Sequence, residues 1–231
     1  MAITVPIQPP GGVLGPASEH FEIERVDYLS PTAGGRVSGV TAGFPLWRGR
    51  WTLSGSLSRE GSEAWRGFVA SLRGQQRAFF GFDYGRPYPL FAPNGFAGFT
   101  RAGGGAFDGS ALSWSVNATR DVVTLTGLPA SQRLRIGDYV MWRWTGADIA
   151  GAGTARRALC RVVEAADISA GGVVSVSVEP PLPSLVPGGA VADLARPCCV
   201  MRLDTGESQI GEKGRMLRVS GTISGLQDLR P

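Results

Sequence analysis

The sequence has one histidine, one lysine and three cysteines among its 231 residues. One histidine excludes most hydrolytic machinery, because a Ser-His-Asp triad would have to use His20 and no GxSxG nucleophile elbow is present. Zinc catalysis needs several histidine, cysteine or carboxylate ligands at set spacings, and these spacings are absent. We therefore expect no enzymatic activity, no catalytic residues, no metal and no cofactor.

The cysteines are odd in number and lack the CxxC spacing of metal sites. Cys198 and Cys199 are adjacent, and adjacent cysteines seldom bridge each other because the geometry is strained. We interpret them, with Cys160, as free thiols in a reducing cytoplasm. The amino terminus has no basic region followed by an apolar run, so we expect no secretory signal. No apolar stretch is long enough to predict a membrane span.

The basic charge is almost entirely arginine, and the formal net charge is only +4. The basic residues are spread along the chain, so we expect no specific nucleic-acid binding. Genomic base composition is one interpretation of this bias. The functional alternative is that the planar guanidinium group of arginine suits ion pairs between packed subunits better than the ammonium group of lysine does.

Glycine and proline are abundant, with 34 and 16 residues, and they separate short apolar runs. This spacing is typical of many tight turns and short strands, so the sequence predicts a mainly β protein. His20–Leu29 alternates as a strand does, a turn-rich stretch follows at 31–39, and Trp51 and Leu53 share one face of the next strand.

One helix is predicted at about residues 58–73, between two strands. Its apolar residues recur at helical spacing and form a single stripe, which consists of Trp65, Phe68, Val69 and Leu72. Ser62 is the expected N-cap, and Gly74 lies where a C-cap glycine belongs. We expect this stripe to be buried against the N-terminal sheet.

Several short strands with turn signals between them follow residue 105 and predict a small barrel or sandwich. Trp142 and Trp144 flank Arg143 on one of these strands, so both indoles share a face. That face is a candidate for stacking on a glycan or a partner's side chain, and core packing is the alternative.

The segment Met216–Ser224 repeats the pattern of Arg50–Ser58, with a Ser-Gly step in the middle of each. We predict that these two strands pair and that the end of the chain returns to the N-terminal domain. The fold expected is a split N-terminal β-sandwich or barrel with one helix, formed by residues 1–95 together with 205–231. Residues 96–204 form an inserted small β-barrel, either OB-like or galectin-like.

Residues 47–84 and 127–140 carry a resemblance to a known family. A strand (RWTLSGSL) leads into a helix of the form W-x-x-F-x-x-x-L-x-G, and an aromatic strand (AFFGFD) follows. The later Gly-Leu-Pro-Ala and Ile-Gly-Asp-Tyr resemble the entry to a second domain. The chain thus resembles the distal tail proteins of long-tailed bacteriophages and prophages.

The resemblance implies a structural virion protein of the tail tip, assembled in the bacterial cytoplasm. Such proteins form a ring, here expected to be a hexamer, that joins the tail tube protein to the baseplate hub or fibre proteins. Candidate subunit-interface residues are the apolar side chains of the Pro/Gly-rich amino terminus and three arginines, namely Ile3, Val5, Ile7, Val13, Leu14, Arg48, Arg50 and Arg59. A carbohydrate-binding module is the alternative function, and a cell-wall glycosidase using two carboxylates is a third.

Overall fold

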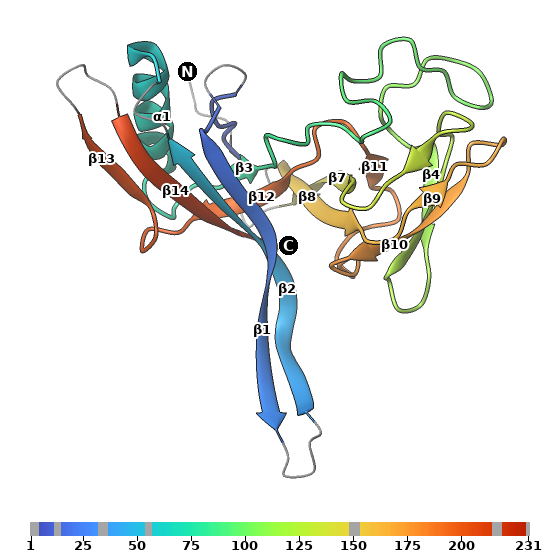
Figure 1. Ribbon diagram of the computed structural model, residues 1–231, viewed down its shortest axis with the longest axis horizontal. Coiled ribbons are helices and arrows are strands. Elements are labelled where there is room, and N and C mark those ends of the chain that lie inside the picture. Colours follow the sequence, from blue (N-terminus) through green and yellow to red (C-terminus); the bar gives the residue numbers. More distant parts are fainter. Residues whose placement is uncertain are drawn as a thin grey trace.

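The computed structural model describes residues 5–11, 15–31, 37–53, 57–147, 153–213 and 219–229. Within these ranges the chain has two six-stranded sheets, a two-stranded sheet and one helix (Figure 1). All strand pairs in the sheets are antiparallel. The predicted mainly β class is confirmed.

The first sheet combines both ends of the chain, in the order β1-β2-β14-β12-β3, with β13 also paired to β14. Its strands are β1 (Ser18–Pro31), β2 (Val37–Leu53), β3 (Phe79–Gly81), β12 (Cys199–Leu203), β13 (Gln209–Lys213) and β14 (Val219–Gln227). The apolar face of β2 holds Trp47, Trp51 and Leu53, all buried. The opposite face holds Arg48 and Arg50.

The last strand pairs with β2, as the repeated Ser-Gly pattern predicts, but the glycines meet in a different register. Gly221 lies opposite Leu53, whereas Gly49 lies opposite Gly225. A Cβ at Gly49 would overlap the Trp51 ring, and one at Gly225 would overlap the Phe79 ring. The glycine pair therefore makes room for two aromatic rings, which pack edge to face with centroids 5.9 Å apart.

β12 joins the first sheet, so residues 199–203 do not belong to the inserted barrel as the sequence analysis expected. This strand pairs with β14 on one side and with β3 on the other. Its run of apolar side chains is typical of a strand that is covered on both faces, and four of its five residues are buried. The return to the first sheet thus occurs before residue 205.

The helix α1 (Arg59–Leu72) occupies the predicted position, but its N-cap is Ser58 and not Ser62. The Ser58 hydroxyl accepts the Gly61 N–H at 3.0 Å, whereas Ser62 is buried inside the first turns. At the other end Arg73 takes the left-handed conformation with φ 50°. The Ser58 side chain thus satisfies one of the N–H groups left unpaired in the first turn. The helix therefore begins at Arg59, four residues before the start that a cap at Ser62 would give.

The predicted apolar stripe of α1 packs on the first sheet. Trp65, Phe68 and Leu72 are buried, and Val69 is partly buried against the same core. Phe68 packs edge to face on Phe79 of β3, with ring centroids 5.5 Å apart. The prediction that this stripe is buried is confirmed.

The second sheet has the order β11-β7-β8-β10-β5-β4. Its strands are β4 (Ser113–Val116), β5 (Val122–Thr126), β7 (Tyr139–Ala147), β8 (Gly153–Val162), β10 (Val174–Glu179) and β11 (Val191–Asp193), while β6 (Arg133–Leu134) and β9 (Ala166–Asp167) form the two-stranded sheet. The segment just before β4 pairs with β11 at the other edge of the sheet, because the Ala111 N–H donates to the Ala192 carbonyl at 2.8 Å and the Leu194 N–H donates to the Gly109 carbonyl at 2.9 Å.

The β7–β8 hairpin forms a wall shared by two hydrophobic cores. Val140 and Trp142 of β7 point into the core of the second sheet, whereas Tyr139 and Met141 point into the core of the first. Leu159 of β8, opposite Met141, also joins the first core. The alternation of a strand therefore lets one hairpin close both interiors.

Candidate functional site

β1 and β2 continue to pair beyond the point where the first sheet ends. Their register runs from Val26↔Ala42 to Pro31↔Val37, whereas β14 pairs with β2 only between Arg48 and Leu53. Residues 25–31 and 37–45 thus form a two-stranded hairpin, here called the arm, which extends away from the body (Figure 1). No described strand pairs with either outer edge of the arm.

The arm leaves the sheet at a break in the strand register. The pairing shifts between Glu24 and Val26, and Gly43 opposite this break has a left-handed φ of 76°. Glycine adopts such a φ without strain, and the two extra residues of β2 at this point bend and twist the strand pair. The arm therefore emerges at a defined place. The turn predicted at 31–39 is shorter than expected, because residues 37–39 lie in β2.

The arm exposes large apolar side chains. Val26 is 52% exposed, Tyr28 65% and Val40 67%. Tyr28 lies directly opposite Val40, and Val26 is two residues from Tyr28, so the three side chains share one face. On the other face the Thr41 hydroxyl donates to Asp27 at 2.6 Å. One face of the arm is thus apolar, and the other carries the Asp27–Thr41 hydrogen bond beside Leu29, which is 71% exposed.

Ion pairs fix the base of the arm and the start of β1 to the second sheet. Arg25 pairs with Glu179 of β10 at 2.6 Å. Arg161 of β8 pairs with Glu22 at 2.6 Å and donates to the Phe21 carbonyl at 2.9 Å. The Arg161 guanidinium also lies over the Trp47 ring, 5.0 Å from its centroid. The arm therefore projects from an anchored base.

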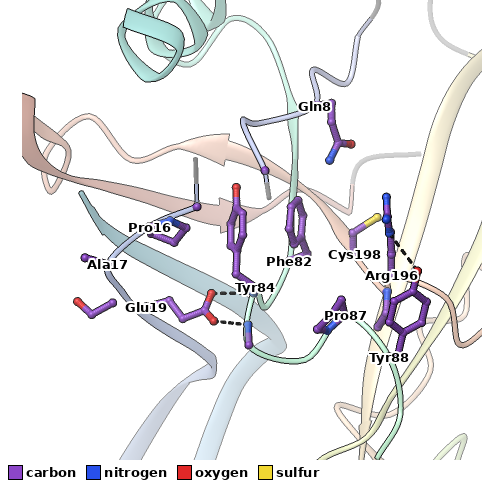
Figure 2. A pocket seen from close by; sticks show the side chains of 15 residues that line it. Gln8, Pro16, Ala17, Glu19, Phe82, Tyr84, Pro87, Tyr88, Arg196 and Cys198 are labelled. Carbon is purple, nitrogen blue, oxygen red and sulfur yellow. Dashed lines mark hydrogen bonds between the residues drawn. The ribbon is translucent and has the colours of Figure 1, made fainter. Parts of the chain in front are cut away.

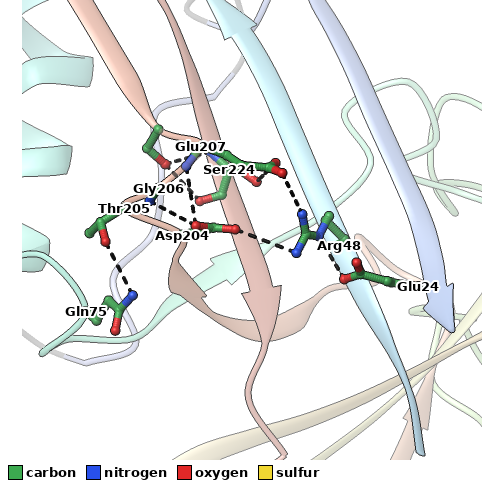
Figure 3. A network of polar contacts seen from close by, with 9 residues as sticks. Glu24, Arg48, Gln75, Asp204, Thr205, Gly206, Glu207 and Ser224 are labelled. Carbon is green, nitrogen blue, oxygen red and sulfur yellow. Dashed lines mark hydrogen bonds and ion pairs between the residues drawn. The ribbon is translucent and has the colours of Figure 1, made fainter. Parts of the chain in front are cut away.

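Arg48, a predicted subunit-interface residue, uses its charge for ion pairs within the chain. It pairs with Glu24 at 2.8 Å and with Glu207 at 2.9 Å, and Asp204 lies 3.6 Å away (Figure 3). These carboxylates raise the pKa of Arg48, although burial opposes them. Three acids around one guanidinium join β1, β2 and the turn after β12, so the positive charge of Arg48 is balanced within the chain.

The other two candidate arginines are placed differently from Arg48. Arg50 lies on the exposed face of β2, and Arg59 is the first residue of α1. Both side chains are exposed, and neither forms an ion pair with a described residue. They remain candidates for contacts with another chain.

The amino-terminal segment is partly docked on its own chain, contrary to the prediction that it lies across a neighbour. Ile7 bridges β3 in parallel, donating its N–H to Ala78 at 2.9 Å and accepting the Phe80 N–H at 3.0 Å. Pairing with this open strand edge satisfies backbone groups that would otherwise face water. Val5 is 37% exposed. The predicted interface residues Ile3, Val13 and Leu14 lie outside the described residues.

Trp142 does not present a stacking face for a glycan or a partner. Its side chain is fully buried in the core of the second sheet, and Trp114 packs against it edge to face at 5.8 Å. Trp144 is partly buried and packs on the same core. Burial of the shared indole face confirms the core alternative for Trp142.

Two carboxyl groups far apart in sequence meet at the crossing between the sheets. Glu19 accepts the Tyr84 N–H at 2.8 Å and the Gly85 N–H at 2.6 Å, and Asp83 accepts the same Gly85 N–H at 2.9 Å. Burial, with a hydrogen bond and charge repulsion from Asp83, raises the pKa of Glu19 to about 7. No spacing signal in the sequence predicts this pair, because its two residues lie 64 positions apart.

We expect the Glu19–Asp83 pair to make the stability fall as pH rises. An acid whose pKa is higher in the folded than in the unfolded state stabilises the fold fully below the unfolded value and loses that contribution above the folded value. For Glu19 this window runs from 4.5 to about 7. Melting temperatures of the Glu19→Gln variant between pH 5 and 8 should lack this decline. Asp167→Asn, at an exposed surface pair, should keep it. Equal slopes in wild type and Glu19→Gln would contradict the assignment.

The three thiols show no sign of activation. Burial raises the pKa of Cys160 and Cys199 well above the usual range, and raises that of Cys198 to about 11. Among the described residues no three histidine, cysteine or acidic side chains gather as a metal site would require. No helix in that part of the chain has the length and hydropathy needed to cross a membrane.

No protein-family model and no curated protein matches the sequence.

Proposed function

We propose that the chain is a structural protein of a bacteriophage tail tip, of the distal tail type. In this proposal it closes into a hexameric ring that joins the tail tube to the baseplate or fibre hub. It is assembled in the bacterial cytoplasm, resides in the virion tail and has no enzymatic role.

The observation that carries the proposal is the arm. An isolated two-stranded hairpin is at best marginally stable in water, and contiguous exposed apolar surface marks an interaction site. Contact between the apolar face of the arm and an adjacent copy would remove Val26, Tyr28 and Val40 from water. Because an arm and its receptor are different surfaces, the contact is heterologous, and such contacts generate rings when the rotation closes.

Electron microscopy and native mass spectrometry of the purified protein test this proposal. We expect closed hexameric rings, with each chain burying more than ~2,000 Å² of total surface with its neighbours. Antibody labelling of virions should mark the tail end. A protein that stays monomeric at micromolar concentration, or that is absent from tails, would contradict the proposal.

The alternative functions have less support from the described side chains. The carbohydrate-binding hypothesis loses Trp142 as a stacking residue because that indole is buried. The carboxyl groups of Glu19 and Asp83 converge on one N–H, whereas glycosidase carboxyl groups stand ~5–9.5 Å apart across a bound sugar.

A further inference from the structure

A cavity of about 780 Å³ lies where three segments of the chain cross between the two sheets. The amino-terminal segment contributes Gln8 and Glu19, the outgoing crossing contributes Tyr84 and Tyr88, and the returning crossing contributes Arg196 (Figure 2). Its size falls within the range of ligand sites, and aromatic rings beside a few polar groups are typical of their linings. We call it the Glu19 cavity.

The cavity has negative charge at one side without a matching cation. Partly buried acids such as Asp193 and Asp228 have an arginine within 3.1 Å. Glu19 and Asp83 form no ion pair with any described residue, although Asp83 lies directly beside Glu19. Half-buried carboxylates are usually paired, because removing a charge from water is costly.

The nearest arginines of the chain are held elsewhere. Arg86 follows the carboxyl pair in sequence, but its guanidinium packs on Gly137 and donates to the Ile136 carbonyl at 3.5 Å. Arg196 donates through Nε to the Tyr88 hydroxyl at 3.3 Å, at the far side of the cavity (Figure 2). A cation for Glu19 must therefore come from outside these contacts.

The lining favours a guanidinium over a metal ion. The rings of Phe82 and Tyr84 lie together, with centroids 4.3 Å apart, beside Glu19. A guanidinium stacks on aromatic faces and forms forked hydrogen bonds to a carboxylate, whereas a metal needs several oxygen or nitrogen ligands. No group of three such ligands occurs in the described ranges.

We propose that the Glu19 cavity receives the arginine side chain of a second copy of this chain. The guanidinium pairs with Glu19, lies beside the Tyr84 ring and is attracted by the second charge on Asp83. This proposal rests on the proposed self-assembly and gives it a specific ionic contact. Arg59 is the leading donor, because it is exposed, has no described ion-pair partner and begins α1, where the helix dipole disfavours a cation. Arg50 is the other candidate.

A small probe tests the cavity independently of assembly. N-acetyl-arginine methylamide should change the tryptophan fluorescence of the whole protein, since Trp65 lies 6.4 Å from Tyr84. We expect saturation in the millimolar range, ~1–10 mM, and a loss of at least about ten-fold in Glu19→Gln. N-acetyl-norleucine methylamide should have no effect, and the Asp167→Asn control should bind as wild type does. Absence of saturable binding, or equal binding by Glu19→Gln, would overturn the site.

A second variant keeps the test valid if Glu19→Gln does not fold. Ala17 lines the cavity and its side chain is exposed, so Ala17→Arg would place a guanidinium there while leaving Glu19 intact. We expect Ala17→Arg to block binding of the probe. Undiminished binding by this variant would also overturn the site.

Sedimentation velocity then tests the donor. Glu19→Gln and Arg59→Gln, or Arg50→Gln in its place, should each weaken assembly, and the double variant should lose no more than either single one. If the probe binds but Glu19→Gln, Arg59→Gln and Arg50→Gln all assemble as wild type does, the proposal that a second copy donates the arginine is refuted. A wild-type chain that stays monomeric would contradict the proposed function, and the fluorescence titration would still decide the guanidinium site.

Discussion

Phe68→Ala is expected to lower the free energy of unfolding by about 3–5 kcal/mol, the range measured for removal of a buried aromatic ring. The Phe68 side chain is only 6% exposed and packs between two rings, with Trp65 at 5.7 Å and Phe79 at 5.5 Å. Its loss would leave a cavity where α1 contacts the first sheet, because rings on either side are held by their own neighbours. Chemical denaturation monitored by tryptophan fluorescence measures the effect.

Two variants on the same helix separate packing from helix propensity. Phe68→Leu keeps most of the apolar volume and should cost less than about 1.5 kcal/mol. Arg66→Ala, at an exposed position of α1, should stay within about 0.5 kcal/mol of wild type. A Phe68→Ala variant as stable as wild type would show that α1 contributes little to this core.

Replacing Val26, Tyr28 and Val40 together by threonine is expected to abolish ring assembly while leaving the fold intact. Threonine suits β-strands, so the arm should keep its pairing. Each apolar side chain buried in a contact contributes about 1.5 kcal/mol or more. Loss of three should therefore weaken association by at least ~100-fold. Sedimentation velocity over a range of protein concentrations gives the association constant.

The matched control removes an exposed apolar side chain away from the arm. Leu112 is 72% exposed and precedes β4 in the second sheet, so Leu112→Thr should assemble as wild type does. Circular dichroism and melting temperature establish that the triple variant is folded. Rings formed by the triple variant at the wild-type concentration would refute a role for the arm.

Sequence periodicity predicted which face of a helix or strand is buried, where that face is marked by the element's own apolar residues. The stripe of α1 and the apolar face of β2 follow from spacings of three to four and of two residues, and both are buried as expected. The repeated Ser-Gly pattern also predicted that β14 pairs with β2. These features require only that one face of an element be apolar.

Other features depend on tertiary positions that no local pattern encodes. The Glu19–Asp83 pair exists because β1 and the outgoing crossing meet, and Arg48 is neutralised by acids from β1 and from the turn after β12. The apolar alternation of Val26, Tyr28 and Val40 is a strand signal, but it does not say that the strands continue past the core. Glycine and proline between residues 31 and 39 predicted a turn there, while the actual pairing resumes at Val37.

The wall formed by the β7–β8 hairpin has a consequence for cooperativity. Because Tyr139, Met141 and Leu159 belong to the first core while Val140 and Trp142 belong to the second, neither half can unfold without uncovering apolar surface of the other. Subdomains that share side chains in this way form a single cooperative unit, and they exchange their amide protons with similar protection factors. Hydrogen exchange should therefore give residues 47–53 of β2 and the residues of β10 equally slow amides, and a grafting experiment that excises residues 96–198 would remove part of the first core along with the second.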